Sequence, residues 1–208
     1  NFTILFICKK YIMKLPIYAY GHPVLRKECE ELEEKDPAVK QILKDMFETM
    51  YAANGVGLAA PQVGMNIRVF IVDATRYADD YKESKDPEER DEYENLKDFK
   101  KVFINPIIVE ETGDEWAFEE GCLSIPEIRA DVNRPENVTI EYFDENWKLK
   151  EETYVGFAAR VIQHEYDHIE GVLFTDKISP IKKRLMQRKL LNIKKGNIDP
   201  GYKMRFSK

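Results

Sequence analysis

The sequence predicts an α+β fold: a single domain in which mixed or antiparallel β-sheets surround a central helix, with one helix N-terminal and one C-terminal to it. A length of 208 residues with 43% hydrophobic residues suits one domain with an apolar core. Segments with helical periodicity and segments with β-type alternation both occur along the chain. Because they do not follow one another in a regular βαβ order, a doubly wound parallel sheet is not expected.

The first predicted helix follows Asp36, the expected N-cap, and has Pro37 at its first position. Apolar side chains recur at helical spacing over residues 39–51. Asn54-Gly55 then supplies a stop signal, because both residue types tolerate the left-handed conformation that often ends a helix. The pattern indicates an amphipathic helix.

Three segments have the composition of β-structure. Residues 67–73 are rich in β-branched side chains, and residues 102–110 form a second strand that Pro106 interrupts. We expect both in one sheet. Alternating side chains over residues 138–154 flank the turn sequence Asp144-Glu145-Asn146, which predicts a hairpin.

Two further helices are predicted in the C-terminal part of the chain. One covers residues 156–169 and ends at Gly171. The other begins at Pro180, is capped by Ser179 and runs towards residue 195. The first of them contains two of the chain's three histidines and is therefore the expected centre of the fold.

The domain organisation is simple. Residues 1–12 are apolar first and basic second, which is not the order of a secretory signal, so we interpret them as a dispensable extension with Met13 as a natural start. Residues 13–208 form the domain. Within it, residues 76–100 hold ten acidic and six basic residues with little apolar periodicity, which indicates a charged, solvated and partly helical excursion, to which we assign no chemistry.

Charge and cysteine content exclude several classes of protein. The net charge is −6, and the basic residues form no dense stripe, so direct nucleic-acid binding is not expected. No apolar stretch approaches the roughly 18 residues needed to cross a bilayer, which argues against a membrane protein. Cys8, Cys29 and Cys122 are an odd number at irregular spacings, which argues against a disulfide framework and favours the cytoplasm.

The most informative pattern is His164-Glu165-Tyr166-Asp167-His168, inside the helix predicted for residues 156–169. Histidines four residues apart lie one helical turn apart and differ by only about 40° in direction, so both imidazoles can reach one ion. Glu165 then lies beside the ion, where a carboxylate can take a proton from a metal-activated water. Two surface histidines on an amphipathic helix are the alternative, but the apolar residues before the pair indicate burial.

A catalytic site of this type needs a third protein ligand and one open position. Cys122 is the best candidate, because the neighbouring Gly121 permits a tight turn and a cation would stabilise the thiolate. His22, next to a proline, is interpreted as a turn or surface residue. Cys8 and Cys29 are interpreted as small apolar residues.

Three motifs in this order carry a family resemblance: GVGLAAPQ at 55–62, EGCLS at 120–124 and QHEYDH at 163–168. They resemble the signature motifs of peptide deformylases. Weaker similarity, including YGHPVLR at 20–26, extends from about Met13 to the last predicted helix. The resemblance therefore covers nearly the whole chain.

The resemblance implies a role for each matching residue. Glu165 would be the general acid/base, and Gln62 and the backbone NH of Leu123 would donate to an oxyanion. The implied metal ligands and substrate-binding residues are, respectively, Cys122, His164 and His168, and Gly55, Val56, Gly57, Arg129 and Arg160. Independently, glycines at 55 and 57 lack Cβ atoms where a peptide backbone has to approach closely, and an extended peptide can pair with a strand edge.

The function implied is hydrolysis of the N-formyl group from the N-terminal methionine of new polypeptides, with release of formate. A water activated by the metal attacks the formyl carbon, and Glu165 moves the proton to the leaving amine. The resemblance points to Fe(II) in the cell, although Zn(II), Ni(II) and Co(II) suit the same donors. The expected partners are N-formylmethionyl nascent peptides, with the ribosomal exit region as a further candidate.

Two other functions remain open from the residues alone. A zinc endopeptidase uses the same helical motif, but its third ligand is generally a histidine or a carboxylate and not a thiolate. A structural metal module would need a fourth protein ligand, for which Asp167 is available. That module would leave Gln62 and the glycine-rich segment without a purpose.

Overall fold

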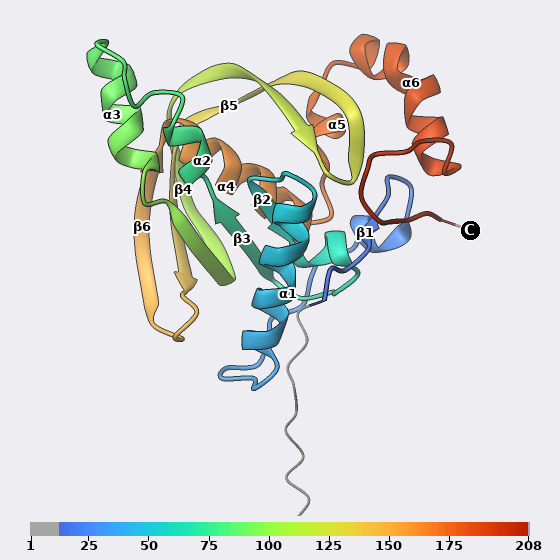
Figure 1. Ribbon diagram of the computed structural model, residues 1–208, viewed down its shortest axis with the longest axis horizontal. Coiled ribbons are helices and arrows are strands. Elements are labelled where there is room, and N and C mark those ends of the chain that lie inside the picture. Colours follow the sequence, from blue (N-terminus) through green and yellow to red (C-terminus); the bar gives the residue numbers. More distant parts are fainter. Residues whose placement is uncertain (1–12, 208) are drawn as a thin grey trace, which may run out of the picture.

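A five-stranded antiparallel sheet and the helix α4 (Gly156–Ile169) form the centre of the fold in the computed structural model (Figure 1). The structure describes residues 13–207, so the predicted extension 1–12 and Cys8 lie outside the described residues. All neighbouring strands of the sheet pair in antiparallel fashion, and a separate pair of short strands is parallel. The predicted α+β class is confirmed.

The central sheet contains the three predicted β-segments and extends well beyond them. Its strands, in spatial and chain order, are β2 (Gly57–Ala59), β3 (Val69–Asp73), β4 (Lys100–Cys122), β5 (Ile125–Phe143) and β6 (Leu149–Val155). The prediction missed the length of β4 and β5, which have 23 and 19 residues and form one long, curved hairpin (Figure 1). Register shifts, one of them at Pro106, bend β4 along its course.

Helix α1 (Val39–Ala52) packs its buried methionines, Met46 and Met50, against the sheet in a core cluster with β2 and β3. The prediction of Asp36 as its N-cap was wrong. Asp36 Oδ1 instead accepts a hydrogen bond of 2.7 Å from the Ala38 NH, so the aspartate closes a turn just before the helix. The predicted stop holds, since Asn54 has a φ of +55° and the next residue donates back to Met50 O.

The charged excursion is partly helical, as predicted, but it is less solvated than its composition indicates. It contains α2 (Thr75–Ala78) and α3 (Pro87–Leu96), the latter capped by Asp86, whose Oδ1 accepts from the Glu88 NH. Ala78 and Leu96 are buried in the core cluster between the sheet and α4. Phe99 is buried in the same cluster, so three apolar residues hold a segment in which periodicity gave no sign of packing.

The excursion also provides the cap of α4. The residue preceding that helix is Val155, whose apolar side chain cannot accept a hydrogen bond. Glu92 of α3 accepts instead, with 2.9 Å between its Oε1 and the Phe157 nitrogen. At Gly156, where φ is +57°, a Cβ would lie 2.7 Å from Glu92 Oε2. A carboxylate at this end of α4 satisfies an unpaired NH and favours the helix dipole.

Replacing Glu92 with alanine is expected to lower the free energy of unfolding by about 1 kcal/mol, the usual effect of losing a helix cap. Urea denaturation followed by circular dichroism measures this difference. Asp91→Ala is the matched control, because Asp91 is an exposed neighbour on the same helix. Equal stability of the two variants would contradict the capping role.

The two ends of the described chain meet beside the sheet. β1 (Ile17–Tyr18) pairs in parallel with β7 (Met204–Arg205). The remaining helical elements are η1 (Pro23–Arg26), η2 (Ala60–Val63), α5 (Phe174–Lys177) and α6 (Pro180–Lys194). Both α4 and α6 have the predicted starts, and Ser179 Oγ accepts from the Lys182 NH as the predicted cap. Among residues 13–207, no helix is long and apolar enough to span a membrane.

Candidate metal centre and cleft

Cys122 is the last residue of β4, directly before a two-residue turn that leads into β5. Cys122 and Ile125 pair across the turn, which Leu123 and Ser124 form. Segments near the two ends of the described chain hold this turn in place. The Tyr20 NH donates to Ser124 O at 2.8 Å, and the Tyr202 hydroxyl donates to Leu123 O at 2.7 Å. The cysteine therefore has a fixed position opposite α4.

The structure brings Cys122 together with the two histidines of α4. One donor atom from each of Cys122, His164 and His168 lies within 4.8 Å of the others, and Cys122 Sγ is 3.3 Å from His168 Nε2. A thiolate and two imidazoles fit a divalent transition metal. Within residues 13–207 this group has three members, which leaves a coordination position open. Asp167 does not join them, since it pairs with Arg134 and Lys177.

Glu120 orients His164 from behind. Its Oε2 lies 2.8 Å from His164 Nδ1, which leaves the other ring nitrogen as the available metal donor. Arg134 forms two hydrogen bonds to the same carboxylate, at 2.7 and 3.0 Å, and Arg160 adds a third at 3.1 Å. Burial alone raises the pKa of Glu120, but the bonds from His164 and Arg134 outweigh it and hold this pKa well below its usual range.

Sequence reasoning missed this supporting network. Glu120 lies inside the EGCLS segment, so its position next to the cysteine was visible, but its function was not. Arg134 follows Glu120 by fourteen residues in the sequence and lies on the next strand, β5. No local sequence pattern distinguishes it. Such a network cannot be recognised from the sequence, because its charged side chains come from different strands and helices and meet only in the folded protein.

Glu165 directly follows His164 in sequence, and only 4% of it is exposed. Burial raises the pKa of its carboxyl to about 7, helped by the neighbouring Glu120 and opposed by His164 and Arg134. Its Oε2 has no hydrogen-bond partner among the described protein atoms. A carboxyl group whose pKa lies near neutral pH, and which has one oxygen without a hydrogen-bond partner, suits proton transfer.

Gly57 accommodates this carboxyl. A Cβ built at Gly57 would lie 2.8 Å from Glu165 Cδ, closer than such atoms can approach. The absent side chain therefore makes room for the catalytic candidate, whereas the sequence had suggested room for a peptide. The strand pairing also leaves room for a peptide beside Gly57. Gly57 pairs with Val72 on one side, and β2 is the edge strand of the sheet.

Gln62 is buried and rigidly oriented. Its Oε1 accepts a 2.7 Å hydrogen bond from the Ala59 NH, which directs the amide nitrogen towards the turn. That Nε2 lies 3.5 Å from Cys122 Sγ and 3.4 Å from Ser124 Oγ. A neutral NH donor is therefore held beside the metal-binding group.

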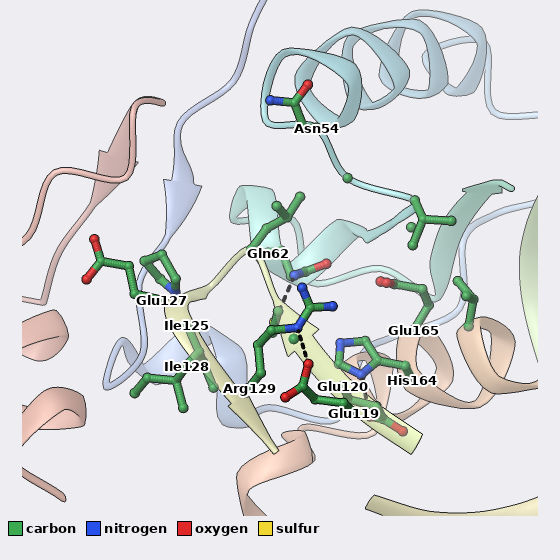
Figure 2. A pocket seen from close by; sticks show the side chains of 18 of the residues that line it. Asn54, Gln62, Glu119, Glu120, Ile125, Glu127, Ile128, Arg129, His164 and Glu165 are labelled. Atoms are coloured by element: carbon green, nitrogen blue, oxygen red, sulfur yellow. Dashed lines mark hydrogen bonds and ion pairs between the residues drawn. The ribbon is translucent and has the colours of Figure 1, made fainter. Parts of the chain in front are cut away.

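A cavity of about 530 Å³ opens onto these groups. Figure 2 shows Gln62, His164 and Glu165 directed into the same space, with Arg129 beside them and paired with Glu119. Every predicted site residue except His168 lines this cavity. His168 is 1% exposed and does not line the cavity, although its Nε2 lies 3.3 Å from Cys122 Sγ.

The two arginines differ in their surroundings. The side chain of Arg129 is 60% exposed and forms a 3.2 Å ion pair with Glu119, so it is available to a ligand. Arg160 is only 2% exposed, and its guanidinium bonds to Glu120, to Val132 O and to Trp116 O. Although Arg160 lines the cavity, both of its terminal guanidinium nitrogens donate hydrogen bonds to protein oxygens.

Comparisons with known proteins agree with this geometry. The family model of polypeptide deformylases matches residues 14–184. A peptide deformylase of Christiangramia forsetii is 59% identical over 196 residues, which is 93% of this chain and 96% of the relative. The crystal structure of a peptide deformylase from Legionella pneumophila has a TM-score of 0.72 and 36% identity, covering 89% of this chain and 98% of its own. One from Synechococcus elongatus, in complex with actinonin, has a TM-score of 0.68 and 35% identity, covering 93% and 92%.

Proposed function

The chain belongs to the polypeptide deformylase family, and from this premise we propose how its residues remove the formyl group from an N-terminal formylmethionine. The protein is a hydrolase of this family. The observation that carries the mechanism is the convergence of one thiolate and two imidazoles beside a buried carboxyl and a buried amide. The same arrangement gives no support to cleavage of internal peptide bonds, because the third ligand of zinc endopeptidases is generally a histidine or a carboxylate.

Cys122, His164 and His168 would hold one divalent metal. When bound, such an ion supplies Lewis acidity, which lowers the pKa of a water and polarises a carbonyl. The mixed thiolate and imidazole donors suit Fe(II), which we propose for the cell, and equally accept Zn(II), Ni(II) or Co(II) during preparation. Glu120 keeps the ring of His164 in the tautomer and orientation that this role requires.

Glu165 is the proposed general acid/base. Its buried carboxylate can take the proton of the attacking water and deliver it to the amine that departs as the formyl C–N bond breaks. Arg160 is reassigned as a positioning residue, because its bond to Glu120 belongs to the network behind His164. The products are formate and a peptide with a free methionine amine.

Gln62 and the Leu123 NH are the proposed oxyanion donors. The fixed Gln62 amide costs no reorganisation when negative charge develops on the formyl oxygen. Leu123 belongs to the turn that both chain ends hold in place. A neutral donor of this kind stabilises the oxyanion without competing for the cation, as a carboxylate would.

The substrate peptide would lie along the edge of β2. Main-chain hydrogen bonds to Val56 and Gly57 do not depend on side-chain identity, so many N-terminal sequences can be accepted. Gly55 contributes by allowing Leu123 to approach, since a Cβ there would lie 2.8 Å from Leu123 Cδ1. Arg129 is the proposed partner for acidic or main-chain oxygen atoms of the peptide, because its side chain is exposed beside the cavity. We propose nascent chains in the cytoplasm, close to the ribosomal exit region, as the substrates.

A direct test compares a formyl-methionyl tripeptide with its acetyl counterpart, using protein purified and loaded with Fe(II) under anaerobic conditions. We expect formate from the formyl peptide and no release of acetate, with activity lost on chelation. Absence of formate from the metal-loaded protein would refute the proposal. Cleavage within an N-terminally blocked peptide would instead support endopeptidase activity.

Replacing Glu120 with glutamine is expected to weaken metal binding roughly tenfold, because outer hydrogen bonds to a ligand histidine typically contribute tenfold or more. Competition with a chromogenic chelator measures the affinity, and circular dichroism verifies the fold. Glu119→Gln is the matched control, since Glu119 is adjacent but exposed and pairs only with Arg129. Equal metal affinity of the two variants would exclude the orienting role of Glu120.

A further inference from the structure

The segment that follows α6 reaches the catalytic cavity. Asp199, Pro200 and Tyr202 line the same cavity as the proposed catalytic groups. These three residues lie beyond residues 14–184, the range that the family model matches. Part of the cavity lining therefore comes from a segment to which membership of the family assigns no role.

This C-terminal segment has a fixed path beside the sheet. The Gly201 NH donates to Asp199 Oδ1 at 3.2 Å, which closes a turn directly before Tyr202. Directly after Tyr202, Lys203 O accepts a 2.9 Å hydrogen bond from the Ile17 NH, where β7 begins to pair with β1 (Figure 1). Three apolar side chains of the segment pack against the core cluster that contains the start of β5: Ile198, Met204 and Phe206. The Tyr202 ring is therefore held from both sides along the chain.

The Tyr202 hydroxyl donates to one of the two carbonyl groups of the turn between β4 and β5, that of Leu123, at 2.7 Å. A phenol is protonated at neutral pH, so it can serve as a donor. The other carbonyl of the turn, that of Ser124, accepts from the Tyr20 NH at 2.8 Å. Each carbonyl of the turn thus has a partner outside the hairpin, and Leu123 depends on a side chain for its partner.

Three groups of the proposed mechanism belong to this turn or border it. Cys122 precedes the turn and supplies the thiolate, and the Leu123 NH is a proposed oxyanion donor. Ser124 is fully buried, and its Oγ lies 3.4 Å from Gln62 Nε2. A hydroxyl that restrains the backbone of Leu123 therefore restrains one oxyanion donor directly, and a shift of about 1 Å at such a group can cost about a hundredfold in rate.

We propose that Tyr202 is a positioning residue for the reaction: its hydroxyl holds Leu123 O and thereby keeps the Leu123 NH directed at the oxygen on which negative charge develops. This inference rests on the proposed deformylase function. The hydroxyl is bonded to the turn, so it acts through the backbone of Leu123. Because the oxyanion exists in the transition state and not in the bound substrate, its loss should lower kcat and leave KM unchanged.

The test compares Tyr202→Phe with the wild-type protein, because phenylalanine keeps the ring and removes only the hydroxyl. With formyl-Met-Ala-Ser, kcat should fall roughly tenfold, less than the 100- to 1,000-fold loss that follows removal of an oxyanion donor itself. KM should stay within about twofold, and the metal content should not change. Tyr18→Phe is the matched control, because the Tyr18 hydroxyl also contacts the C-terminal segment, at Arg205, but not the turn. It should retain wild-type kcat.

A double-mutant cycle with Gln62→Leu identifies the donor through which Tyr202 acts. If the hydroxyl positions the Leu123 NH, Tyr202→Phe should still lower kcat roughly tenfold when the Gln62 amide is absent, because the two donors then contribute separately. If its effect disappears in that background, the hydroxyl acts through Ser124 and Gln62 instead, and the proposal is wrong.

The proposal is also overturned if kcat of Tyr202→Phe stays within about twofold of the wild type, or if KM rises while kcat is unchanged. A fall in kcat that only follows a loss of metal contradicts it as well, because the hydroxyl would then support the ligand Cys122. Failure of the proposed function itself is distinguishable, since the wild-type protein would then release no formate from any formyl peptide.

Discussion

Glu165→Gln is expected to lower kcat for formyl-peptide hydrolysis roughly a thousandfold, within the usual range for loss of a general acid/base. Glutamine keeps the size of the side chain but cannot accept the proton of the attacking water. The metal content should be unchanged, since the three ligand atoms come from other residues. Single-turnover formate release and metal analysis on the same sample measure both quantities.

The control for this variant is Glu151→Gln, because Glu151 is exposed on β6. It should retain wild-type kcat and metal content. Activity of Glu165→Gln within tenfold of the wild type would remove Glu165 from proton transfer. Loss of the metal together with the activity would instead make Glu165 a structural neighbour of the ligands.

Gly57→Ala is expected to lower kcat/KM roughly a hundredfold while the melting temperature changes little. The new methyl group would occupy the place of the Glu165 carboxyl, with only 2.8 Å to its Cδ. The end of a glutamate side chain can move aside at little cost in stability, but a displacement of about 1 Å is enough to cost about a hundredfold in rate. Steady-state kinetics and thermal denaturation measure the two effects.

A double-mutant cycle identifies the cause of this loss. If Gly57→Ala acts by displacing Glu165, it should have little further effect in the Glu165→Gln background, because the displaced group no longer functions. If the methyl group instead blocks the peptide from the edge of β2, the two losses should add. Additive losses would thus support the explanation that Gly57 leaves room for the peptide. They would contradict the explanation that it leaves room for Glu165.

Local signals allowed much of the fold to be predicted. The predicted start and end of α4 agree with the structure, and α6 begins at the predicted Pro180 behind the Ser179 cap. These boundaries depend on residues adjacent in sequence, whose conformational preferences act within one or two turns. Where a local signal had two solutions, prediction failed: Asp36 closes a turn instead of capping α1, because either arrangement satisfies its carboxylate.

Non-local contacts could not be predicted in the same way. The length of the β4–β5 hairpin depends on pairing between two strands with several register shifts. The parallel pairing of β1 with β7 joins segments at opposite ends of the described chain. The charged excursion packs through one carboxylate and a few apolar and aromatic side chains that lie at irregular spacing, so they produce no periodic pattern.

By itself, the sequence determined the chemistry that is available: two imidazoles one turn apart, a carboxylate between them, a cysteine next to a glycine, and an amide in a glycine-rich segment. Only the tertiary structure decided how these groups are supported, through Glu120 with Arg134, the space that Gly57 leaves for Glu165, and the hydrogen bond from Tyr202 to Leu123. The physical reason is that residue type and helical spacing are local, whereas burial, charge neutralisation and steric fit arise from side chains that meet only when distant segments pack together.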